Sequence, residues 1–71
     1  MNSYFIQSNG NDKEVTLMCI NYNCELKVIH EKRFDDEFYN VIMISPSIII
    51  INFKTVNMYL DLSTFEVIKI E

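Results

Sequence analysis

Hydrophobic and polar residues alternate along several short stretches of this chain, as they do in half-buried β-strands. The clearest alternation covers residues 22–28, where the even-numbered residues are apolar. Further alternating stretches and short apolar runs, separated by turn residues, predict strands at residues 4–7, 14–20, 38–44, 48–53, 56–60 and 65–70. Residues that favour strands are plentiful and alanine is absent. We therefore predict an all-β fold, a small antiparallel meander of six or seven short strands.

Two segments of the chain, residues 15–30 and 56–71, predict the same β-hairpin. In the first, one register aligns the apolar residues as opposite pairs around a turn at Asn21-Tyr22: Val15 with Val28, Leu17 with Leu26, and Cys19 with Cys24. The same register shifted by 41 residues pairs Met58 with Val67 and Leu60 with Phe65, with residues 61–64 as the turn. A slip of one residue would turn either apolar set towards solvent.

The offset of 41 residues lies within the period of β-propeller blades. Residues 55–64 are similar to the last two strands of a WD-type blade, and this resemblance implies that copies of the chain could assemble into a ring. The Gly-His and Trp-Asp signatures of that family are absent. We therefore interpret the offset as two similar hairpins.

Helical alternatives exist for two segments. Phe34, Phe38 and Val41 have helical spacing within a charged stretch, so residues 31–40 are either a short helix or an irregular connection. Residues 15–29 also present one apolar helical face, although their asparagine, cysteine and β-branched residues disfavour a helix. Turns are expected at Asn9-Gly10 and at residues 45–47, which include the only proline.

The apolar content is high for a single small domain spanning residues 1–71. Hydrophobic residues make up 49% of the chain, whereas a domain of this size buries only about 60% of its unfolded surface. The runs at residues 41–44 and 48–51 place apolar groups on both faces of their strands. We predict that one face is covered by another copy or by a protein partner, so that the chain is a homo-oligomer.

The net charge of −4 disfavours nucleic acid as a partner. Neither apolar run approaches the roughly 18 residues of a membrane span, and the N-terminus does not resemble a signal peptide. We therefore expect a cytoplasmic protein without a membrane partner. Two cysteines are too few for a disulfide framework, and a reducing compartment would keep them as thiols.

No group of residues in the sequence has the spacing of a metal, cofactor or catalytic site. Cys19 and Cys24 are separated by four residues, and with His30 they make only three candidate zinc ligands. We expect both cysteines to pack in the core as small apolar residues. His30 is the only histidine, and we place it on a solvated strand edge. We predict a protein without cofactor, metal or enzymatic activity.

Two charged clusters are the candidate binding residues. The acidic run Asp35, Asp36 and Glu37 could dock onto a basic groove of a target protein. The basic residues Lys32 and Arg33 could instead hold a small anionic ligand such as a nucleotide between subunits, with Tyr59 or Tyr22 as a stacking surface and Lys13 opposite His30. The first hypothesis, an oligomeric protein that occludes a macromolecular target like an inhibitor or immunity protein, is preferred. Sequestration of an anionic ligand is the alternative.

Overall fold

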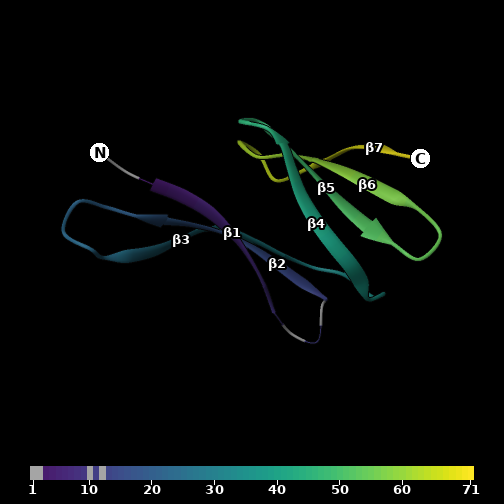
Figure 1. Cartoon of the computed structure of the whole chain (residues 1–71), viewed down its shortest axis with the longest axis horizontal. Helices are drawn as coiled ribbons and strands as arrows, with labels where there is room; N and C mark the ends of the chain where they lie inside the picture. The colour runs from purple at the N-terminus through teal and green to yellow at the C-terminus, as the bar shows by residue number, and fades with distance from the viewer. Residues whose placement is uncertain (1–2, 10, 12) are drawn as a thin grey trace.

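The computed structural model describes residues 3–9, 11 and 13–71, which form seven antiparallel β-strands and no helix (Figure 1). The strands are β1 (Ser3–Asn9), β2 (Glu14–Ile20), β3 (Leu26–Arg33), β4 (Phe38–Ser45), β5 (Ile48–Phe53), β6 (Asn57–Asp61) and β7 (Val67–Ile70). They form two sheets: sheet A in the order β1-β2-β3, and sheet B in the order β4-β5-β6-β7. The predicted antiparallel meander is confirmed.

Sheet B is organised around β5, which pairs with β4 on one side and β6 on the other. Ile49 and Ile51 are fully buried against sheet A, and Phe53 on the same face is also buried. Ile48 and Ile50, on the opposite face, are only half-buried. The isoleucine run therefore presents apolar groups on both faces of its strand, as predicted.

The predicted register of the first hairpin is wrong. Leu17 lies opposite His30, not Leu26, and Ile20 lies opposite Leu26. The reason is the loop, which occupies residues 21–25 because the Asn21 Oδ1 accepts hydrogen bonds from the backbone N–H groups of Asn23 and Glu25 (2.9 and 3.1 Å). The third strand therefore begins four residues later than the alternation at residues 22–28 predicts.

This shift also corrects the predicted pairing of the two cysteines. Cys19 is buried on β2, as expected, but Cys24 is exposed in the loop with a positive φ of 63°. The expected position of Lys13 opposite His30 is wrong for the same reason, because the Lys13 carbonyl accepts from the N–H of Phe34 (2.8 Å).

The predicted register of the second hairpin is also wrong, by two to three residues. Met58 lies opposite Ile70 and Leu60 lies opposite Val67. Phe65, expected within the last strand, belongs to the turn and has a positive φ of 60°. Its N–H donates to the Asp61 carbonyl (2.7 Å), which directs its side chain into the core.

Both helical alternatives are wrong. Residues 14–20 and 26–33 are strands, and the connection that follows β3 covers only residues 34–37 before β4 begins. The charged residues after Phe34 form a short bend, so the irregular connection expected over residues 31–40 is confirmed only for residues 34–37, and the rest of that range is strand. The predicted Asn9-Gly10 turn falls at a position that lies partly outside the described residues.

The core lies between the sheets and is formed mainly by sheet B and its turns. Its buried members are Val15, Leu17, Phe38, Ile49, Ile51, Phe53, Leu60, Leu62 and Phe65. Phe34 packs edge-on against Phe38 and Phe53, with ring centroids 6.3 and 5.3 Å away. Such T-shaped aromatic contacts are favourable beyond the area they bury, so they fix the connection between the sheets.

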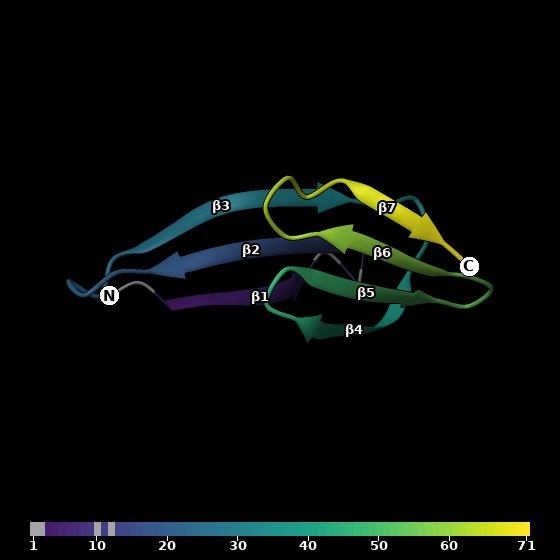
Figure 2. The same cartoon turned by 90° about the horizontal axis from the view of Figure 1, so that it is seen from above.

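The two sheets are offset along the strand direction and overlap only in the middle of the molecule (Figure 2). The molecule measures 41 × 24 × 16 Å, whereas its longest strands, of eight residues, span about 26 Å. The β2–β3 loop and the adjoining strand ends of sheet A extend well beyond sheet B in both views (Figures 1 and 2). This offset creates a step on the inner face of sheet A.

Candidate binding groove at the step between the sheets

An open groove lies at this step, with a volume of about 530 Å³. Sheet A forms its floor and the ends of sheet B form its wall. The lining residues, which we call the ledge groove, are Tyr4, Leu17, Ile29, His30, Met43, Pro46, Ser47, Leu62 and Ser63. The volume falls within the range of about 300–1,000 Å³ that is usual for ligand pockets.

The ledge groove presents apolar side chains that the chain itself leaves uncovered. Tyr4 is 58% exposed, Met43 is 48% exposed and Ile29 is 40% exposed. Beneath them, Leu17 and Leu62 are buried and connect the groove to the core. Exposed apolar groups gathered in a concave site are typical of a binding surface.

A β-bulge aims the residues of β3 into the groove. The register of β2 and β3 shifts between Leu17 and Met18, which leaves Ile29 without a directly paired residue. The His30 ring stacks on the Phe65 ring with centroids 5.5 Å apart and 9° between their planes. Its Nε2 also lies 3.2 Å from the Ser63 carbonyl oxygen. His30 therefore joins the floor of the groove to its wall.

The serine side chains that border the groove are engaged in hydrogen bonds within their own turns. The Ser63 hydroxyl donates to the Asp61 Oδ1 (2.6 Å), and the Ser63 N–H donates to the same oxygen (2.7 Å). These two bonds hold the pKa of the Asp61 carboxyl below its ordinary value. The Ser47 hydroxyl lies 3.3 Å from the Ser45 hydroxyl.

The predicted acidic residues Asp35, Asp36 and Glu37 lie together in the β3–β4 connection and are exposed. They share a shallow hollow of about 460 Å³ with Lys13 and Lys54. The acidic run thus lies near two basic groups, and it is separate from the ledge groove.

The predicted basic residues and Tyr59 lie on different sheets. Lys32 is paired with Val15 in sheet A, and the Arg33 guanidinium lies 3.9 Å from Glu14 in a largely exposed ion pair. Tyr59 lies on β6 of sheet B. A site that combined all three residues would therefore need a second copy of the chain.

Tyr59 has partners of its own at the C-terminal end of sheet B. Its hydroxyl donates to Glu71 (2.9 Å), and the Lys69 Nζ lies 5.3 Å from its ring centroid and 3.0 Å from the Glu71 carboxylate. The hydrogen bond to Glu71 raises the pKa of Tyr59. Lys69 and then Tyr59 lower the pKa of Glu71, whose carboxylate in turn raises the pKa of Lys69.

The structure gives two further findings for the part of the chain that it describes. No group of three or more histidine, cysteine, aspartate or glutamate side chains lies close enough to hold a metal ion. No helix within residues 3–9, 11 and 13–71 is long and apolar enough to cross a membrane.

The ledge groove was not predicted from the sequence, because it arises from the offset between the sheets. Comparison with family models, with curated proteins and with solved structures finds no match to this chain. Its function is therefore inferred from the geometry of the molecule.

Proposed function

We propose that this chain is a small acidic binding protein without enzymatic activity, which occludes a protein target as an inhibitor or immunity protein does. The ledge groove is the observation that carries the proposal. Tyr4, Ile29 and Met43 line it and are exposed in the isolated chain. A few well-packed anchor residues contribute most of the binding energy of an interface, and tyrosine is enriched among them. The proposed target inserts an apolar segment into this groove.

The polar groups around the groove support binding in preference to catalysis. A nucleophile needs an adjacent base within hydrogen-bond distance. The Ser63 hydroxyl donates to the Asp61 carboxylate, but the same oxygen also accepts backbone N–H groups of the turn, and these bonds lower the pKa of Asp61 and make it a weaker base. The His30 ring contacts the Ser63 carbonyl and the Phe65 ring, so it does not contact the Ser63 hydroxyl. These groups hold the wall and floor together.

The distribution of charge supports a target with a basic rim. All of the net charge of −4 lies within residues 34–71, and residues 1–33 carry equal numbers of acidic and basic side chains. The exposed run of Asp35, Asp36 and Glu37 contributes most of this excess. Opposite charges on two partners raise the rate of association and favour correct partners.

Affinity capture from the native host, followed by mass spectrometry, tests this proposal with two neighbouring substitutions. Ile29→Lys places a charge in the ledge groove. Val28→Lys is the matched control, because Val28 is 51% exposed but pairs with Met18 on the opposite face of sheet A. We expect the wild type and Val28→Lys to capture the same protein in a stoichiometric complex. Ile29→Lys should lose that protein because a lysine ammonium cannot be buried without a partner.

Equal capture by both variants, or loss of the target from Val28→Lys alone, would contradict a groove-mediated complex. Circular dichroism of both variants checks that the sheets remain folded. The cytoplasmic location and the assembly into oligomers stay predictions.

A further inference from the structure

The four strands at the sheet edges differ in charge. The edge strand β3 carries Lys27, Glu31, Lys32 and Arg33, and the short edge strand β7 carries Lys69. The edge strands β1 and β4 carry no charged residue at all. These two uncharged edges lie along the same side of the molecule, with β3 and β7 along the other (Figure 2).

The β4 edge is the longer of the two uncharged edges and is rich in exposed apolar residues. Tyr39 is highly exposed, Ile42 is 43% exposed, and Met43 and Ile44 are also exposed. Natural proteins usually protect a free edge with charged residues, because its unpaired N–H and C=O groups can bind another strand. Bulges interrupt the β4–β5 register near both ends of β4 but leave residues 40–43 regular.

We infer that β4 pairs in antiparallel fashion with β4 of a second copy of this chain, about a twofold axis at Ile42. Each Ile42 then lies opposite its counterpart, and Val41 lies opposite Met43 of the other copy. Both pairs are apolar, and such cross-strand pairs stabilise a sheet. The inference deepens the oligomeric part of the proposed function, since it names the surface that joins the copies.

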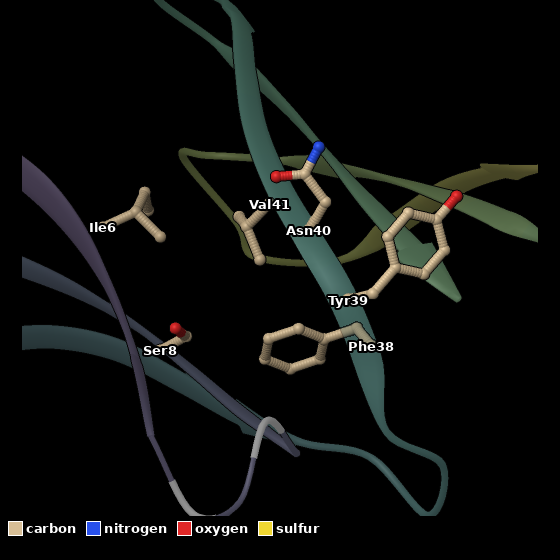
Figure 3. A pocket seen from close by; sticks show the side chains of 6 residues that line it. All are labelled: Ile6, Ser8, Phe38, Tyr39, Asn40 and Val41. Atoms are coloured by element: carbon tan, nitrogen blue, oxygen red, sulfur yellow. The ribbon is translucent and has the colours of Figure 1, made fainter. Parts of the chain in front are cut away.

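A groove of about 300 Å³ beside β4 supports this pairing. The Ile6 and Ser8 side chains of β1 lie across from Val41 and Phe38 of β4 (Figure 3). Met43 of the second copy would lie next to Val41 at the open side of this groove. The second copy would thus cover apolar groups from both sheets.

The charges of the chain favour the antiparallel arrangement over a parallel one. The acidic residues 35–37 directly precede β4. Antiparallel pairing places the two acidic runs at opposite ends of the paired strands, at least about 25 Å apart. This separation is several times the Debye length of about 8 Å, so their repulsion is screened. Parallel pairing would bring the two runs together.

Light scattering coupled to size exclusion measures the assembly directly. The wild type is expected at twice the chain mass at high micromolar concentration, and Ile42→Lys at the mass of a single chain, because two ammonium groups would face each other at the twofold axis. Val28→Lys, which adds the same charge to an exposed valine of β3, is expected to keep the wild-type mass. A monomeric wild type, or an Ile42→Lys variant that stays dimeric, would overturn the inference.

Disulfide trapping tests the register. Ile42→Cys is made together with Cys24→Ala, which removes the exposed native thiol and leaves the buried Cys19. Directly opposite residues of an antiparallel pair have Cα atoms about 4.5–5.5 Å apart, which suits a disulfide. Oxidation should cross-link the two copies of Ile42→Cys and leave Val28→Cys in the same background without a covalent link between the copies. Equal cross-linking at the two positions would contradict the twofold axis at Ile42.

The two proposals can fail separately. Ile42 does not line the ledge groove, so target capture by Ile42→Lys reports on the groove without the dimer. A variant that is monomeric and still captures the target would support both the pairing of β4 and an independent groove. If the wild type is monomeric and its capture of the target depends on Ile29, the proposed function is supported and the β4 pairing is refuted.

Discussion

The β2–β3 turn and the β6–β7 turn close in the same way. Each begins with a side chain, Asn21 or Asp61, whose Oδ1 accepts backbone N–H groups two and more residues further along. Each ends with a non-glycine residue in the left-handed region, Cys24 with φ 63° or Phe65 with φ 60°. The next residue is a glutamate whose carbonyl accepts from the N–H of the first residue (3.2 and 3.0 Å). The second turn is one residue longer.

The two turns differ in what the left-handed residue contacts. Cys24 is exposed, and the β2–β3 loop to which it belongs extends beyond sheet B (Figure 2). Phe65 is buried, stacks on His30 and supports the wall of the ledge groove. A left-handed conformation costs a residue with a Cβ about 1–2 kcal/mol. Packing offsets this cost at Phe65, whereas no core contact offsets it at Cys24.

Alanine substitution at the two left-handed positions should give the largest difference in stability between the two turns. Phe65→Ala is expected to lower the free energy of unfolding by about 3–5 kcal/mol, because it removes a buried aromatic side chain. Cys24→Ala should change it by less than about 0.5 kcal/mol, as is usual for exposed positions. Both variants keep a Cβ in the same backbone conformation, so the difference reports on packing alone. Urea denaturation followed by circular dichroism measures both values, and similar losses would contradict the assigned roles.

Strand positions were predicted best where one face of the strand is buried in the core, and least well for β3, which begins four residues later than predicted. The predicted bounds of β2 and β5 agree with the structure, and both strands place Val15, Leu17, Ile49 and Ile51 in the core. Their inner faces are covered by the opposite sheet, so an apolar residue is required at every second position, and in β5 the isoleucine run places apolar residues on the outer face as well.

The registers could not be predicted in the same way, because loop length sets them. The signal for a left-handed residue is normally glycine or asparagine, and here Cys24 and Phe65 take this conformation. Side-chain caps from Asn21 and Asp61 lengthen both loops beyond the predicted turns. The ledge groove depends in turn on the offset between sheets, which no local pattern encodes.

Glycine substitution should change the free energy of unfolding in opposite directions at the two positions, and the change at Cys24 is expected to be small. Cys24→Gly should raise the free energy of unfolding by about 0.5–1 kcal/mol, because glycine removes the left-handed penalty but gains entropy in the unfolded chain. Phe65→Gly should still destabilise the protein, since the lost packing exceeds the relief of the backbone. Urea midpoints of the two variants provide the measurement. A loss of stability in Cys24→Gly would show that the exposed loop has a packing role.

Exchanging aspartate and asparagine at the first residue of each turn should give the smallest change in stability, and that change should depend on pH. Hydrogen bonds from Ser63 lower the pKa of Asp61, so the folded state binds fewer protons at this group than the unfolded state. The stability it contributes is present above about pH 4, the ordinary range of an aspartate, and is lost as the pH falls through the lowered pKa. Asp61→Asn should therefore reduce the loss of stability in acid, measured as urea midpoints against pH.

Asn21→Asp is the matched change in the other turn. It places a carboxylate where Asn21 accepts two backbone N–H groups, so a new loss of stability in acid is expected. The lowered pKa of Glu71 also makes the protein less stable in acid, and it is common to the wild type and both variants. Differences between their pH profiles therefore come from the turns. If both exchanges left the pH profile unchanged, the hydrogen bonds to Asp61 and Asn21 would not control the stability of the turns. The two loops would then be held by their backbone pairing and by the core contacts of Phe65.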